Sequence, residues 1–221
     1  MGGRARGLAA ASVLAVLLGG CAVDAGTAPS PSPSSVAPAA SPSAGADCPP
    51  VRPPTPGTSF DQDLHDELMA MLERDQAGRL GTGQDDEGDQ ARTDRLMEII
   101  VVHGWPTFAL VGEDAEDAAW AIAQHSDLDA AAQRCALEHL RAAVEAEQAS
   151  PGNLAYLEDR VHAGAGEPQR YGTQVACADT GPEPATPLVD PARIDQFRAS
   201  AGLPPFEDYL AEMAQICAEV S

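Results

Sequence analysis

The chain has 221 residues and is strongly acidic, with 34 Asp and Glu against 13 Arg and no Lys, which gives a formal net charge of −21. This charge disfavours nucleic acid as a partner, because phosphate contacts need clustered basic side chains. The absence of Lys excludes Schiff-base catalysis and phosphate-loop nucleotide binding, since both depend on a Lys side chain.

The first 20 residues have the features of a secretory signal. Arg4 and Arg6 precede an apolar run over residues 8–18, which is shorter than the roughly 20 residues that span a bilayer. The run ends in Leu18-Gly19-Gly20-Cys21, which resembles a bacterial lipobox. We therefore expect cleavage before Cys21 and lipidation of that residue. A plain cleaved signal or a short retained anchor is the alternative.

The segment that follows is dominated by Ala, Pro, Ser and Gly over residues 22–57. Such a composition cannot bury enough apolar surface to offset the entropy lost on ordering. Together with Cys21, it predicts a disordered tether over residues 21–57. As a coil, the tether spans roughly 30–35 Å, which holds the following domain away from the lipid surface.

Residues 58–221 predict a single compact domain of mainly α-helical class, long enough at about 160 residues to bury a core. Apolar side chains recur at helical spacing, as in the stripe formed by Leu64, Leu68 and Met71. Helix caps are expected at Asp89, Asp127 and Ser150. The expected helices cover residues 60–80, 89–103, 113–125, 128–148, 150–163, 190–202 and 206–220.

Two shorter features complete the expected domain. Tyr171–Ala178 and Pro187–Val189 predict two short strands of a hairpin around a turn at residues 180–182. Trp105 lies between Gly104 and Pro106, which end a helix, and we expect its ring to fill the core.

Four cysteines remain beyond Cys21, and in an oxidising compartment they predict two disulfides with three possible connectivities. We favour Cys48 with Cys217, which would tie the two ends of the domain, and Cys135 with Cys177 between them. The chain has no Cys-x-x-Cys pair, so zinc ribbons and thioredoxin-type motifs are disfavoured.

Several polar residues fall on helix faces that otherwise indicate core. Asp75 and Arg79 are one turn apart on the apolar stripe of the first helix and can pair. We expect this interior cluster to contain Asp75, Arg79, Arg92, His103, His125 and Gln133. It is either a closed network that fixes the helix register or a site for an anionic ligand, because paired arginines suit such ligands.

Further polar candidates lie on both sides of this cluster in the chain. Asp159 and Arg160 are either a surface pair or part of a binding site. The run from Tyr171 to Gln174 offers a phenol, a hydroxyl and an amide to a polar ligand, or bonds loop backbone instead. Gln124 extends the candidate set.

Catalytic templates are mostly missing. There is no His-Glu-x-x-His, no Gly-x-Ser-x-Gly and no glycine-rich phosphate loop. The spacing of His125, Asp127 and Asp129 is common by chance, so we expect neither a metal site nor a cofactor. His125 and His103 remain candidates for a general base, because His titrates near neutral pH.

A set of short motifs lies between residue 60 and residue 210. They are His103 to Thr107, Val111-Gly112, Ala118 to Trp120, Gln124 to Asp127, Gln133, Ala155 to Leu157, Asp159 to Val161, Gln169 to Gln174, Asp190 and Gly202-Leu203. On these residues the run resembles the DUF6624 family of uncharacterised bacterial proteins. The resemblance implies a shared fold and leaves the activity open.

The leading hypothesis is a lipoprotein anchored through Cys21 on the extracytoplasmic face of the bacterial cell membrane. Its domain would act as a binding or structural accessory module, with an anionic or polar cell-envelope molecule as its ligand. The alternative is a cell-envelope hydrolase that uses His125 or His103 as general base and Arg79 as an anion clamp.

Overall fold

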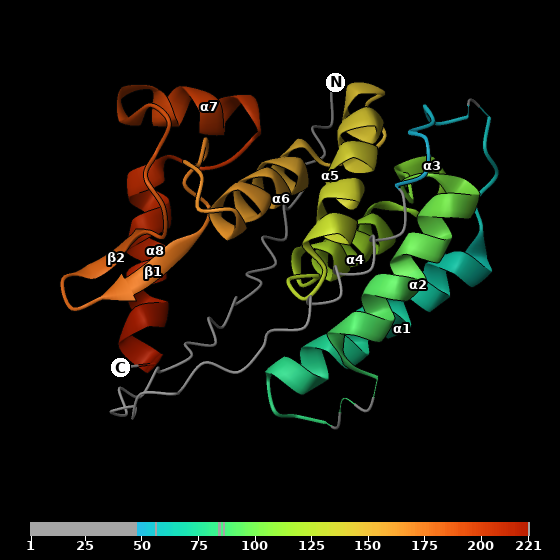
Figure 1. Ribbon diagram of the computed structural model, residues 1–221, viewed down its shortest axis with the longest axis horizontal. Coiled ribbons are helices and arrows are strands. Elements are labelled where there is room, and N and C mark those ends of the chain that lie inside the picture. The colour runs from blue at the N-terminus through green and yellow to red at the C-terminus, as the bar shows by residue number, and fades with distance from the viewer. Residues whose placement is uncertain (1–47, 56, 84, 86, 221) are drawn as a thin grey trace, which may run out of the picture. The chain divides into compact units, whose positions relative to one another are not determined.

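The computed structural model describes residues 48–55, 57–83, 85 and 87–220 (Figure 1). The predicted signal peptide, Cys21 and residues 22–47 of the predicted tether lie outside these described residues. Across the described ranges, no helix is both long enough and apolar enough to cross a membrane.

The described domain is mainly α-helical with one two-stranded antiparallel hairpin, which confirms the predicted class. Its elements are α1 (Gln62–Arg79), α2 (Gly88–His103), α3 (Phe108–Val111), α4 (Glu113–Gln124), α5 (Ala130–Glu145), α6 (Pro151–Gly164), β1 (Val175–Ala178), β2 (Gly181–Pro184), the 3₁₀ turn η1 (Pro191–Arg193), α7 (Ile194–Ser200) and α8 (Phe206–Val220).

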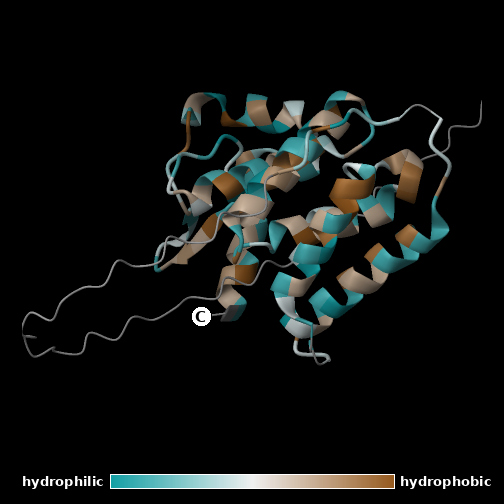
Figure 2. Ribbon diagram, turned by 45° about the vertical axis from the view of Figure 1, so that its right-hand side comes forward, coloured by the Kyte–Doolittle hydropathy of each residue, from teal (hydrophilic) through white to brown (hydrophobic). Residues whose placement is uncertain are grey.

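Helix α4 is central to the core, because α1, α2, α5 and α6 all pack against it (Figure 1). Its small side chains let the neighbouring helices approach closely, and Ala115, Ala118, Ala119 and Ala123 are fully buried. The predicted stripe of α1 joins this core. Hydrophilic and hydrophobic residues alternate along the helices in Figure 2, as expected for amphipathic elements.

The helix caps differ from prediction at Asp127 and Asp89, because an arginine side chain binds each of these two carboxylates. Ser150 caps α6 as predicted, accepting from the amide of Asn153 at 3.2 Å. The cap of α5 is Asp129 rather than Asp127, whose carboxylate binds Arg160. Asp89 lies inside α2 and binds arginine, so the prediction that it caps the helix was wrong.

The first strand of the hairpin ends at Ala178 as predicted, but it begins at Val175 rather than Tyr171, and the chain turns earlier. Strands β1 and β2 pair from Val175 with Pro184 to Ala178 with Gly181, leaving a two-residue turn. Such a tight turn fixes the register of the strands, so the returning strand follows at once. Leu188, expected in the second strand, instead forms an isolated parallel bridge with Gln169.

Two predictions concern the end of α2: the one for Trp105 is correct and the one for His103 is wrong. Trp105 is buried in the core, as expected, and its Nε1 donates to Glu116 Oε1 at 3.0 Å. His103 is exposed, contrary to the expectation that it faces the interior. The helix ends at this residue, so the stripe that places His103 inward is no longer covered by a neighbouring helix.

The disulfides join Cys48 to Cys135 and Cys177 to Cys217, so the favoured pairing was wrong. Strand β1 packs on α8, which brings Cys177 to Cys217 and away from α5. Residues near Cys48 were assigned to the tether, yet the Pro49 carbonyl lies 3.2 Å from His139 Nε2 on α5. The first described residues are therefore fixed to the domain.

Candidate functional site

Asp75 is the centre of the interior polar cluster and is fully buried near the end of α1. His125, which ends α4, places its Nδ1 atom 3.0 Å from Asp75 Oδ1. Arg79 Nε donates to the same oxygen at 3.1 Å, and Gln76 Nε2 donates to Oδ2 at 2.8 Å. The cluster therefore joins α1 to the end of α4.

Arg92 closes the other side of this cluster, and only 1% of its side chain is exposed. Its two terminal nitrogens bind both oxygens of Asp85 at 2.7 and 2.8 Å. The same guanidinium donates to Asp89 at 2.7 Å and lies 3.7 Å from Asp75. A bidentate pair of this kind fixes geometry as well as charge. It holds the loop between α1 and α2 against the core.

Three carboxylates share two guanidiniums in this cluster, because Arg79 also donates to Asp89 at 2.8 Å. Burial opposes ionisation of Asp75, yet the His125 hydrogen bond and the charges of Arg79 and Arg92 lower its pKa below the usual value. Hydrogen bonds from Arg92 and from the Gly88 amide also hold the pKa of Asp85 well below its usual range. The two arginines are thus neutralised by the protein's own aspartates.

Two members of the cluster have unused hydrogen-bonding capacity: Arg92 at its buried Nε atom, and His125 at its imidazole ring. The His125 Nδ1 atom lies 3.0 Å from Asp75 Oδ1 and 3.1 Å from Arg79 Nε. A proton on Nδ1 serves the carboxylate, whereas a lone pair there accepts from the guanidinium, so the two neighbours favour opposite tautomers. The Nε2 atom has no hydrogen-bond partner among the described residues. The side chain keeps 6% exposure. Asp75 and Arg79 together fix the orientation of the imidazole, whose Nε2 side is the one left for a ligand.

The remaining residues of the predicted cluster have different positions. Gln133 Nε2 lies 3.2 Å from the Ala123 carbonyl and 3.3 Å from the Gln124 carbonyl, so it satisfies the end of α4. Gln124 is buried, and its amide lies 3.5 Å from the Tyr156 carbonyl. His103 is not brought into the cluster and forms no hydrogen bond with the described part of the chain.

A second polar cluster forms around Asp159, which is fully buried on α6. Its carboxylate accepts from the amides of Arg170 at 2.7 Å, Tyr171 at 3.1 Å and Thr173 at 2.9 Å, and from the Thr173 hydroxyl at 3.1 Å. Of the two alternatives for Asp159 and Arg160, the surface pair is therefore wrong, because Asp159 binds loop amides instead. Asp159 organises the loop that enters the hairpin.

Arg160 connects the segment after α4 to the loop before β1. It binds Asp127, and its NH1 atom donates to Gln174 Oε1 at 3.1 Å. Gln133 Nε2 also lies 3.2 Å from Asp127 Oδ1. The structure thus brings Gln133, Asp127, Arg160 and Gln174 into one line of polar contacts between α4 and the loop before β1.

Close packing and buried amides shape the loop at residues 169–174. Gln169 is fully buried and makes reciprocal bonds with the Gln174 backbone, at 2.9 Å to its carbonyl and 2.8 Å from its amide. Gly172 has φ +65°, and a Cβ there would lie 2.7 Å from the Phe206 ring. Only glycine fits at this position, so residues 169–174 form a tightly packed loop in which Tyr171 is half-buried.

Two buried charged residues and one half-buried one were not among the predicted site residues. Arg198 is fully buried, donating to the Pro204 and Tyr171 carbonyls at 2.6 and 2.8 Å, and burial lowers its pKa. Asp85 is half-buried and lies in an acidic loop whose composition gave no sign that it would bind Arg92. Glu116 is fully buried, and burial raises its pKa to about 8. The signal for Glu116 in the sequence was its position directly before Asp117 in an Ala-rich helix, where one of two adjacent carboxyls can face the core.

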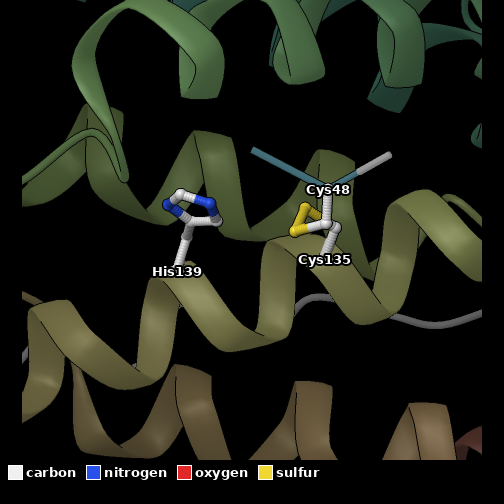
Figure 3. Close-up of side chains that lie close together, drawn as sticks. All are labelled: Cys48, Cys135 and His139. Carbon is white, nitrogen blue, oxygen red and sulfur yellow. A yellow bond between two sulfur atoms is a disulfide. The ribbon is translucent and has the colours of Figure 1, made fainter. Parts of the chain in front are cut away.

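The described ranges also contain one group of potential metal ligands. Sulfur atoms of Cys48 and Cys135 and a ring nitrogen of His139 lie within 4.8 Å of one another. Figure 3 shows the imidazole beside the disulfide on one face of α5. Both cysteines also line a groove of about 600 Å³ between α5 and the end of α6.

No curated protein and no solved structure matches the chain. The chain does match DUF6624, a family of unknown function, over residues 62–217. This range runs from the start of α1 into α8, so it includes both polar clusters and leaves Cys48 outside. The chain therefore belongs to the DUF6624 family.

Proposed function

We propose that this protein is a lipid-anchored extracytoplasmic accessory module, held at the bacterial cell membrane through Cys21. The observation that carries the proposal is the Cys48–Cys135 disulfide, because it crosslinks the base of the predicted tether to a core helix. Tension transmitted along the tether would reach α5 directly, without unravelling the chain before α1. Two disulfides also suit an oxidising compartment outside the cytoplasm.

Replacing the proposed lipid attachment residue tests the location. We expect Cys21→Ala to abolish labelling with a fatty-acid analogue and to release the protein from the membrane fraction. Cys48→Ser is the matched control, since it removes a cysteine outside the lipobox and should keep the label. Unchanged membrane retention of Cys21→Ala would contradict the lipoprotein proposal.

The interior cluster serves this module as structural support. Its two arginines are already bound by three aspartates, which leaves no free cation for an anionic ligand. The module would therefore bind its ligand elsewhere on the domain. The cluster would hold the loop between α1 and α2 against the core.

A hydrolase-like activity with His125 as general base is the second candidate, and the orientation of His125 by Asp75 favours it. Such a base removes a proton from water through Nε2 and returns it to the leaving group. His103 is no longer favoured, because it is exposed and has no orienting partner within the described residues.

The enzyme candidate is testable with peptidoglycan fragments and with p-nitrophenyl esters as substrates. If it is correct, His125→Gln should remove turnover while the melting temperature stays close to that of the wild type. Exposed His103→Gln is the matched control and should keep full turnover. Release at the buffer rate from every substrate would count against an enzyme of this class.

A further inference from the structure

We propose that Cys48, Cys135 and His139 form a Zn²⁺ site when the disulfide between the two cysteines is reduced. Cys135 and His139 are one turn apart on α5, so both side chains project from the same face (Figure 3). Cys48 comes from the first described segment and completes a set of three ligand atoms within 4.8 Å. Two thiolates and one imidazole suit Zn²⁺ and leave a fourth position for water.

The environment of His139 supports a ligand role. The residue is only 2% exposed, and its Nδ1 atom is buried without a hydrogen-bond partner in the described chain. A buried polar atom of this kind calls for an explanation such as a bound ion or water.

To bind the metal, the two sulfur atoms must move apart, and only Cys48 can make this movement. Zinc–sulfur bonds of about 2.3 Å in a tetrahedral site place two sulfurs about 3.8 Å apart, so the reduced thiols must separate. Cys135 is fixed on α5, whereas Cys48 is exposed and lies in a segment without regular secondary structure. The adjoining groove gives an ion access to both sulfurs.

The two states exclude each other chemically. An external dithiol breaks the sulfur–sulfur bond by supplying two electrons and two protons, and it becomes a disulfide itself. Zinc binding then releases both thiol protons. Either state fixes Cys48 to α5, so the base of the predicted tether would be free only when the chain is reduced and without metal.

Cobalt titration of the reduced full-length protein tests the proposal, because thiolate-bound tetrahedral Co²⁺ absorbs visible light. We expect one equivalent of Co²⁺ to bind, to be displaced by Zn²⁺, and to give no such band with the oxidised protein. His139→Gln should weaken Zn²⁺ binding by at least about tenfold, the lower end of the range for lost partners of metal ligands.

The second disulfide supplies the matched control. Cys177→Ser with Cys217→Ser removes the other pair and should keep the cobalt band, whereas Cys48→Ser should lose it. If reduction without metal unfolds the chain, one equivalent of Zn²⁺ should restore the helical circular dichroism signal. The proposal is overturned if reduced wild type neither binds Co²⁺ nor regains helix with Zn²⁺, or if Cys48→Ser binds as the wild type does.

Discussion

Glu116 shows how the surroundings of a single side chain set its protonation. The carboxyl is fully buried, and its oxygens accept from Trp105 Nε1 and Asn153 Nδ2, each at 3.0 Å. These donors favour the charged form, but burial outweighs them and the neighbouring Asp117 adds to the effect, so the pKa rises from 4.5 to about 8. The neutral acid is therefore the folded form near neutral pH.

This shift predicts how stability depends on pH. The unfolded chain releases the Glu116 proton above about pH 4.5, while the folded protein keeps it up to about pH 8. The contribution is thus fully present below pH 4.5 and is lost as the pH rises to 8. We expect Glu116→Gln to flatten this decline in a plot of melting temperature against pH. Parallel curves for variant and wild type would show that Glu116 titrates normally.

At the scale of elements, the loop between α1 and α2 depends on one buried cation. Arg92 binds Asp85 in the loop and Asp89 in the helix, and it also lies near Asp75. Arg79 is less buried, with 27% of its side chain exposed, and Asp75 keeps His125 and Gln76 without it. We therefore expect Arg92 to contribute more than Arg79 to the free energy of unfolding.

We expect Arg92→Ala to lower the free energy of unfolding by about 3–5 kcal/mol, the usual loss when a buried ion pair is broken. Arg79→Ala should cost only about 1–3 kcal/mol, because the Asp75 carboxylate retains other donors. Urea denaturation of both variants measures the difference. A larger loss for Arg79→Ala would mean that Asp75, rather than the loop aspartates, carries the network.

Helices were predictable because their apolar spacing is local in the sequence. The partners of polar side chains were not, since they depend on which helices meet. Asp127 and Asp159 illustrate this. From sequence, Asp127 was expected to cap a helix and Asp159 to lie at the surface or in a site, but in the fold Asp127 binds Arg160 and Asp159 binds loop amides. The inward position of Asp75 and Arg92 followed from their helix stripes, but the role of Asp85 required the folded loop.

At the scale of the whole molecule, the two disulfides close separate stretches of chain with separations of 87 and 40 residues. The favoured pairing from sequence was instead nested, with one bridge inside the other. Separate loops constrain the unfolded chain independently, and the entropy model assigns about 4.6 and about 3.9 kcal/mol to them. Each bridge should therefore matter to stability on its own.

The pairing itself can be tested by removing one cysteine and identifying the thiol left behind. We expect Cys48→Ser to expose Cys135 to alkylation, because Cys135 loses its partner while Cys177 and Cys217 stay bonded. The nested pairing predicts that Cys217 is alkylated instead, so mass spectrometry of the labelled peptides separates the two. Cys177→Ser is the reciprocal variant and should label Cys217. Because α8 holds Cys217 beside β1, labelling of Cys135 in that variant would contradict the packing of the hairpin on α8 as well as the pairing.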